Sequence, residues 1–196
     1  MTALAIAQAP PPARPLRWLL SAPVWGMVAG IWLLTWGGTA LSGRWSLNTV
    51  VLVHLFTLGV LGNTMLGALT QFLPVAAGSP LPLSRTLDWL HGAFNLGLAL
   101  FVIALPAGHR SALFAASLLL SLPLLLFALA ALPALLRRGA QRVLRSGIGM
   151  ALLALMTTAL GGALLVAIVA GTLAWPLDRL TDVHAALGLF GWVTVL

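Results

Sequence analysis

Five uninterrupted apolar runs constrain this chain more than any other feature of its sequence. They cover residues 18–41, 47–73, 87–106, 112–136 and 147–174, and a sixth apolar run at 183–196 has only 14 residues. At 1.5 Å per residue, about 20 helical residues cross the hydrocarbon core of a bilayer. The pattern therefore predicts an all-α fold, a polytopic transmembrane helix bundle with about six spans.

The sequences at the two ends of the chain predict how the helical region begins and ends. The Ala- and Pro-rich stretch 1–17 predicts a disordered cytoplasmic tail, followed by a transmembrane helical domain over 18–196. Fourteen helical residues cover only about 21 Å, which is less than a span needs. We therefore expect the span at 183–196 to be incomplete and the chain to be part of a longer protein.

Composition excludes several other classes of protein. Hydrophobic residues make up 61% of the chain and charged residues 7%, against roughly 25% charged residues in a soluble domain. So few charges exclude a soluble enzyme and a nucleic-acid binder, despite the net charge of +7. A β-barrel is unlikely because the apolar runs do not alternate. The chain has no cysteine, so a metal or a haem would have to be held by histidine or methionine.

The arginines predict how the helices are oriented. Seven lie in the tail and in the segments after the second and fourth spans: Arg14, Arg17, Arg85, Arg137, Arg138, Arg142 and Arg145. Only three lie on the opposite side: Arg44, Arg110 and Arg179. Basic segments stay in the cytoplasm, so the N-terminus is predicted to be cytoplasmic. The contact surface of such a protein is the lipid bilayer, and the oligomeric state is left open.

Histidines are the candidate functional residues, because no other ionisable side chain lies in the middle of a span. His54 lies about seven residues into the second span, and His184 begins the sixth apolar run. Both are predicted in the outer half of the membrane, on helices of the same direction. An intramembrane histidine is costly unless it is paired or ligated. Two imidazoles on two helices can approach one cofactor from opposite sides.

A weak internal repeat links these two histidines. The sequence VHLFTLG at 53–59 recurs as VHAALG at 183–188, a separation of 130 residues. Gly62 and Thr64 loosely match Gly191 and Thr194, although the first glycine is offset by one position. Two alternatives remain open: chance similarity between Leu- and Gly-rich helices, and histidines that only bond to a backbone carbonyl.

His91 is a third candidate metal ligand, with a weaker case. Asp88 precedes it by three residues and Asn95 follows it by four, so the three share one helix face. Asp88 could fix the tautomer of His91, as carboxylates do beside ligating histidines. Its predicted depth is on the cytoplasmic side, away from His54 and His184. A structural or proton-relay role is therefore favoured over metal ligation.

Two segments resemble a known family. The segment HLFTLGVLGNTMLGALTQFLP at 54–74 resembles a histidine-bearing helix of bacterial proteins related to haem–copper oxidase subunit I, the NnrS type included. The segment VHAALGLFGWVT at 183–194 resembles a later helix of the same group. The resemblance implies the first half of a twelve-helix protein of the bacterial inner membrane. It also implies a haem near the outer face and an electron-donor protein or a quinol as partner.

Carried over by position, His54 matches a haem ligand and His184 a metal-site histidine, with copper as a further candidate cofactor. Gly59 and Gly62 would leave room for a porphyrin beside His54. The chain departs from true oxidases because it has no tyrosine and contains neither a His-His pair nor a His-x-His motif. Oxygen reduction is therefore not implied, no catalytic residue is assigned, and the sequence does not decide whether the protein is an enzyme.

Three functions remain in competition. The first is a haem-binding integral membrane protein that acts in electron transfer or in handling nitric oxide or metal stress. The second is a small-molecule transporter or permease. Helix breaks at Pro74, Pro106 and Pro123 would favour it, but no acidic or basic side chain lies mid-span to bind a charged substrate. The third is a non-catalytic assembly subunit. The Leu- and Ala-rich span at 112–136 is predicted to face lipid and to be passive.

Overall fold

The computed structural model describes residues 5–77, 86–136 and 142–196, and every regular element in these ranges is helical. The elements are a short 3-10 turn η1 (Ile6–Gln8), α1 (Ala13–Ala40), α2 (Leu47–His54), a π-helix η2 (Leu55–Gly62), α3 (Asn63–Ala77), α4 (Thr86–Ala107), α5 (Arg110–Leu136), α6 (Arg142–Val169), α7 (Leu177–Ala186) and a second π-helix η3 (Leu187–Val193). The predicted all-α class is confirmed.

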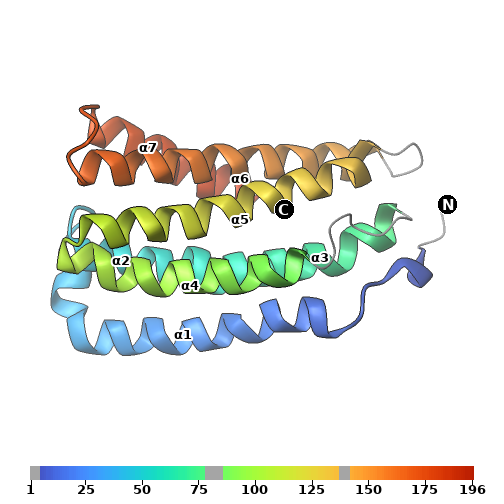
Figure 1. The fold of residues 1–196 in the computed structure, drawn as a ribbon, viewed down its shortest axis with the longest axis horizontal. Helices are drawn as coiled ribbons and strands as arrows, with labels where there is room; N and C mark the ends of the chain where they lie inside the picture. The colour runs from blue at the N-terminus through green and yellow to red at the C-terminus, as the bar shows by residue number, and fades with distance from the viewer. Residues whose placement is uncertain (1–4, 78–85, 137–141) are drawn as a thin grey trace.

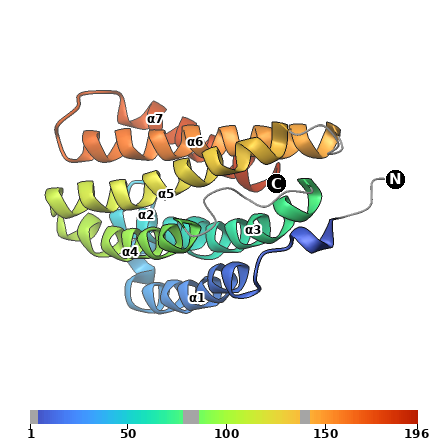
Figure 2. The ribbon, with the colours of Figure 1, turned by 45° about the vertical axis from the view of Figure 1, so that its right-hand side comes forward.

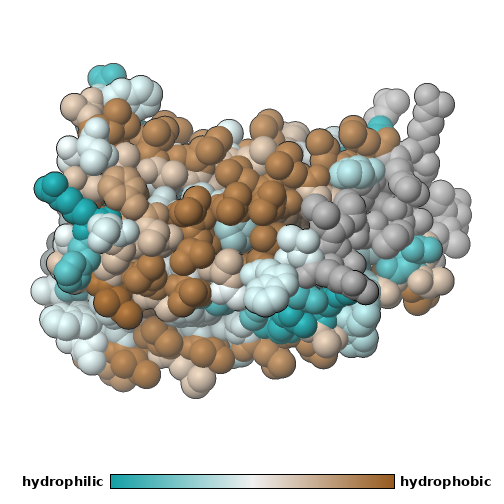
Figure 3. Space-filling view, viewed as in Figure 1, coloured by the Kyte–Doolittle hydropathy of each residue, from teal (hydrophilic) through white to brown (hydrophobic). Residues whose placement is uncertain are grey.

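Five helices of the described residues are long and apolar enough to cross a membrane: Ala13–Ala40, Leu47–Ala76, Asp88–Ala107, Arg110–Pro133 and Arg145–Val169. Large apolar side chains on them face outward, among them Leu34, Ile103 and Leu153. Figure 3 shows apolar side chains across the middle of the molecule and hydrophilic ones gathered toward its two ends. The chain is thus a multi-pass membrane protein whose outer surface is suited to lipid.

Successive spans run antiparallel along the long axis of the bundle (Figure 1). In both Figure 1 and Figure 2, α1 lies on one side and the α6–α7 pair on the other, with α4 and α5 between them. The span formed by α2, η2 and α3 packs on α1 and α4, and α7 with η3 packs on α6. The second and sixth spans therefore run in the same direction, as the sequence predicts.

The span at 112–136 has one outward apolar face, which carries Leu118, Leu122 and Leu129, and one buried face. Helix α5 packs between α4 and α6 and buries one of its faces, including Leu113, Ala116 and Phe127. A Cβ atom on Gly97 of α4 would lie 2.8 Å from the Cβ of Leu119, so the two helices are in close contact there. The two serines inside this helix mark the buried side: Ser117 is buried, and Ser121 donates to the carbonyl of Ala159 on α6 at 3.2 Å.

Both ends of the helical region differ from the predicted boundaries. Helix α1 begins at Ala13, five residues before the predicted start of the span, because prolines lack an N–H and are tolerated in the first helical turn. Part of the stretch predicted to be disordered is therefore helical, and residues 1–4 lie outside the described residues. Helix α7 begins at Leu177, six residues before the predicted start of the sixth run. Its first turn carries Asp178, a favourable charge at a helix N-terminus.

Prolines do not interrupt the spans where the sequence predicts breaks. Helix α3 continues through Pro74, α5 continues through Pro123, and Pro106 lies in the last turn of α4. The α-helical pattern changes instead at the two π-helices, each of which lies inside a longer helix. The proline argument for a transporter is therefore weakened.

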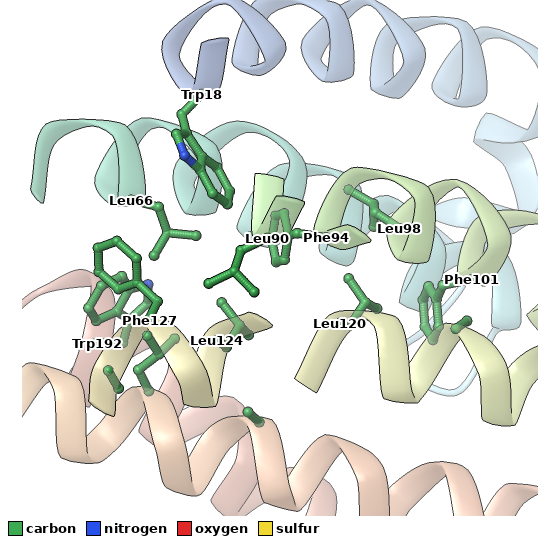
Figure 4. Close-up of a cluster of buried hydrophobic side chains, with 14 of the residues drawn as sticks. Trp18, Leu66, Leu90, Phe94, Leu98, Phe101, Leu120, Leu124, Phe127 and Trp192 are labelled. Atoms are coloured by element: carbon green, nitrogen blue, oxygen red, sulfur yellow. The ribbon is translucent and has the colours of Figure 1, made fainter. Parts of the chain in front are cut away.

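The apolar core is one continuous cluster that extends from α1 to α6 and η3. Trp18 of α1 is 2% exposed and reaches toward α3 and α4, where it packs on Phe94 with ring centroids 5.7 Å apart. Figure 4 shows this cluster, with Leu66 and Leu90 beside it and Phe127 next to Trp192. Trp192 belongs to η3, so the sixth helix contributes to the same continuous core.

Candidate functional site

His54 and His184 lie side by side in the structure. Their ring centroids are 6.1 Å apart and their planes differ by 18°. Each histidine lies seven residues beyond the start of its helix, at Leu47 and at Leu177, which is about 10 Å along the axis. The two residues therefore lie at the same height along the bundle, although they are 130 residues apart in sequence.

Each histidine ring is held through Nδ1 by a backbone carbonyl. Nδ1 of His54 lies 2.7 Å from the carbonyl oxygen of Val50, one turn earlier in the same helix. Nδ1 of His184 lies 3.0 Å from the carbonyl oxygen of Thr158 on α6. A carbonyl oxygen only accepts, so both Nδ1 atoms carry the hydrogen and donate it. In a neutral imidazole this leaves a lone pair on Nε2, the usual arrangement of a ligating histidine.

Aromatic and glycine neighbours pack around the pair. The ring of His54 packs on Phe101 of α4, with centroids 4.8 Å apart. The ring of His184 lies over two glycines of α6: a Cβ on Gly162 would be 3.2 Å from its Cε1, and one on Gly161 would be 3.5 Å from its Nδ1. The Gly161–Gly162 pair thus provides the space that lets His184 approach α6 and reach the carbonyl of Thr158.

Besides the carbonyl that binds His184, Thr158 places its hydroxyl group near the histidine pair. Its hydroxyl oxygen is buried and makes no hydrogen bond to any described residue. A buried hydroxyl without a partner costs roughly 1–3 kcal/mol. The residue whose carbonyl fixes His184 therefore also presents an unsatisfied polar atom in the same neighbourhood.

A π-helix follows each of the two histidines. The first, η2, begins at Leu55, directly after His54, and the second, η3, begins at Leu187, three residues after His184. Each π-helix packs on the helix that precedes its own span, η2 on α1 and η3 on α6. The weak sequence repeat therefore corresponds to a repeated local structure. Single π-helical turns occur frequently at functional sites.

The two glycines predicted to leave room for a cofactor accommodate neighbouring side chains instead. A Cβ on Gly59 would lie 2.7 Å from the Cβ of Trp25, which shows that α1 packs closely there. A Cβ on Gly62 would lie 3.5 Å from Phe94 of α4 and 3.3 Å from a carbonyl oxygen of its own helix. Both glycines thus serve helix packing in this structure.

His91 lies in a different place and has a different environment. It precedes Phe101 by ten residues on α4, which is about 15 Å along the helix, so the structure does not bring it to the histidine pair. Its Nε2 lies 2.9 Å from the hydroxyl of Ser21. The same hydroxyl lies 2.9 Å from the carbonyl oxygen of Arg17, so Ser21 links the ring of His91 to the backbone of α1.

Sequence reasoning missed a cluster of polar side chains in the middle of the bundle. Asn63 is fully buried and forms two hydrogen bonds with Asn95, between Nδ2 and Oδ1 in each direction, at 3.2 and 3.1 Å. Trp25 donates from Nε1 to Oδ1 of Asn95 at 2.6 Å. The available signal was Asn63 itself, an amide inside a long apolar span, where a polar side chain needs a partner.

Metal ligands are sparse in this structure. Within the described ranges, no group of three or more His, Cys, Asp or Glu side chains is arranged to hold a metal ion. No family model, curated protein or solved structure matches this chain. The resemblance to haem–copper oxidase subunit I and to the NnrS type therefore rests on the two histidine-bearing segments alone.

Proposed function

We propose that His54 and His184 would hold a haem, and that the protein transfers electrons within the membrane. The observation that carries this proposal is the nearly parallel, neighbouring pair of imidazoles, each with Nδ1 bonded to a carbonyl and Nε2 left for a ligand. Histidine is also the commonest protein ligand for haem iron.

The separation of the two ring centroids is that of two imidazoles bound to one metal ion. Metal–nitrogen bonds of about 2.0 Å, with roughly 1 Å from each nitrogen to its ring centre, place two centroids about 6 Å apart. The measured separation is 6.1 Å. A haem brings four equatorial nitrogens and needs only two ligands from the protein. A metal ion without a porphyrin needs more ligands than this pair supplies, which favours haem over copper alone.

A bound haem would supply a one-electron redox centre. The chain's own residues would fix the two imidazoles: the carbonyls of Val50 and Thr158 set their tautomers and orientations, and such bonds make the ligands more basic. Phe101 and the surrounding apolar helices would keep water away. With both histidines holding the metal, no position would be left for nitric oxide, so electron transfer is favoured over binding of nitric oxide. An electron-donor protein or a quinol remains the proposed partner.

Absorption spectroscopy tests the proposal. The full chain, purified in mild detergent with haem supplied, should show a Soret band that shifts on reduction with dithionite. His54→Ala should abolish or strongly alter that band, because it removes one axial ligand. The control is His109→Ala, at an exposed histidine between α4 and α5, which should leave the spectrum unchanged. A colourless wild-type protein would refute haem binding. The remaining candidate functions would then be those of a transporter and an assembly subunit.

The orientation in the membrane is part of the same proposal. Among the described residues, the arginines near the starts of α1 and α6 lie at one end of the bundle: Arg14, Arg17, Arg142 and Arg145. Arg44, Arg110 and Arg179 lie at the other end. The remaining three, Arg85, Arg137 and Arg138, lie outside the described residues. We place the first end in the cytoplasm of a bacterial inner membrane, following the bias of basic segments. A reporter enzyme fused after Arg142 should be cytoplasmic, and one fused after Gly108 should be periplasmic. The reverse pattern would overturn this orientation.

A further inference from the structure

Asn63 connects the first π-helix to the rest of the bundle. It directly follows η2 and is 0% exposed. Its Nδ2 donates to two carbonyl oxygens within η2, those of Gly59 at 2.9 Å and of Leu58 at 3.3 Å. The junction between a π-helix and an α-helix changes the backbone hydrogen-bond pattern, and every backbone polar group inside a membrane needs a partner. The Asn63 amide supplies hydrogen bonds to this junction.

Asn63 is itself fixed by two other helices. Oδ1 of Asn63 accepts from Nδ2 of Asn95 on α4, and the Nδ2 of Asn95 also donates to the carbonyl of His91. Oδ1 of Asn95 accepts from both Asn63 and Trp25 of α1. Trp25 in turn packs against Gly59, inside η2, where an added Cβ would lie 2.7 Å from the Cβ of Trp25. Three helices therefore converge on η2 through one connected set of hydrogen bonds.

The position of His54 depends on this segment. His54 is the residue immediately before η2, while Asn63 is the first residue after it. A π-helical turn holds one residue more than an α-helical turn, and one residue corresponds to about 100° of rotation around the helix axis. If η2 returned to α-helical geometry, His54 would rotate relative to α3 and would no longer face His184.

We propose that Asn63 is the positioning residue for His54: locked to Asn95 and Trp25, its carboxamide keeps η2 in π-helical form and so directs the His54 ring toward His184. One consequence of this inference, the loss of a haem ligand, rests on the proposed function. It makes a separate claim about the distance between two side chains, which can be measured without haem.

The first measurement uses haem. Asn63→Leu removes the hydrogen bonds while keeping a similar volume, and it should lose the spectrum of a haem with two histidine ligands. Its matched control is Thr70→Val, at a second buried polar residue of α3. Thr70 bonds only to the carbonyl of Leu66 in its own helix, at 2.7 Å, so this variant should keep the wild-type spectrum.

The second measurement does not need haem. The chain has no cysteine, so the double variant His54→Cys with His184→Cys carries the only two thiols. A short bifunctional thiol reagent should bridge them, and the intact mass separates one bridging linker from two singly attached linkers. We expect the bridge to form in this background and with Thr70→Val added, and most of it to be lost when Asn63→Leu is added.

The outcomes separate the two proposals. If the wild-type protein binds no haem but Asn63→Leu abolishes the bridge, the proposed function fails and the positioning role stands. If Asn63→Leu keeps both the bridge and the haem spectrum, the positioning role is refuted. Should Asn63→Leu fail to fold, the pair Asn63→Leu with Asn95→Leu replaces both amides by apolar groups and can restore stability. A folded double variant that keeps the bridge would also refute the positioning role.

Discussion

The histidine pair and His91 are both intramembrane histidine sites, yet their environments are opposite. In His54 and His184, Nδ1 donates to a backbone carbonyl, so Nε2 is left for a ligand. In His91, Nε2 is hydrogen-bonded to the hydroxyl of Ser21. Its ring packs edge-on against Trp18, with ring centroids 4.9 Å apart. The backbone partner, rather than burial alone, makes an intramembrane histidine a candidate ligand.

The charges around the two sites differ as well. Near His91, the carboxylate of Asp88 lies 3.2 Å from the guanidinium of Arg17 and 3.8 Å from that of Arg14. Near the pair, the one charge contact among the described residues is Asp182 with Arg44, at 2.8 Å. Asp182 lies on α7, two residues before His184, and Arg44 lies in the connection that leads into α2. This contact links the two helices that carry the pair.

The largest expected effect separates the two histidine sites directly. His184→Ala should abolish the Soret band or shift it to that of a haem with one protein ligand, because it removes a ligand atom. His91→Ala should leave the spectrum unchanged, because His91 is about 15 Å from Phe101 along α4 and its Nε2 is already bonded. Spectra of both purified variants, oxidised and reduced, make the comparison. A normal spectrum in His184→Ala, or a lost band in His91→Ala, would reverse our assignment of the two sites.

Sequence patterns predicted the spans and the partnership of the two histidines. Runs of 20 or more apolar residues mark spans because the bilayer sets their length. The alternation of basic segments gave the direction of each span, and equal direction with equal depth brought His54 and His184 together. Both arguments depend on the number of residues along a helix, and the thickness of the membrane limits that number.

The packing of the helices could not be predicted in the same way. Water distinguishes the faces of a soluble helix, but lipid and protein interior are equally apolar. The leucines of α5 therefore do not show which of them are buried, and only Ser117 and Ser121 mark the face on which Leu113 and Phe127 lie. Glycines were ambiguous for the same reason: Gly59 looked like space for a cofactor and instead packs on Trp25. The π-helices, and with them the role of Asn63, depend on contacts with α1 and α4 that are distant in sequence.

A medium effect is expected from filling the space beneath His184. The added Cβ of Gly162→Ala would lie 3.2 Å from Cε1 of His184, so the ring must shift by a few tenths of an ångström. A shift of that size should cost on the order of 1 kcal/mol and weaken haem binding by about fivefold. The matched control on α6 is Gly149→Ala, where nothing lies within 4 Å of the new atom. Haem titration of both variants measures the difference; equal affinities would show that Gly162 does not position the ring.

The smallest expected effect compares the two carboxylates that accompany the two sites. Asp182→Asn should weaken haem binding slightly, because it removes the contact between Arg44 and the helix of His184. Asp88→Asn removes the contacts with Arg14 and Arg17 and should leave haem affinity unchanged. Exposed ion pairs contribute at most about 1 kcal/mol, so neither variant should unfold the protein. Haem titrations at low and high salt measure both effects, since salt screens such pairs. A larger loss in Asp88→Asn than in Asp182→Asn would mean that the His91 region, despite its separate hydrogen bonds, is coupled to the histidine pair.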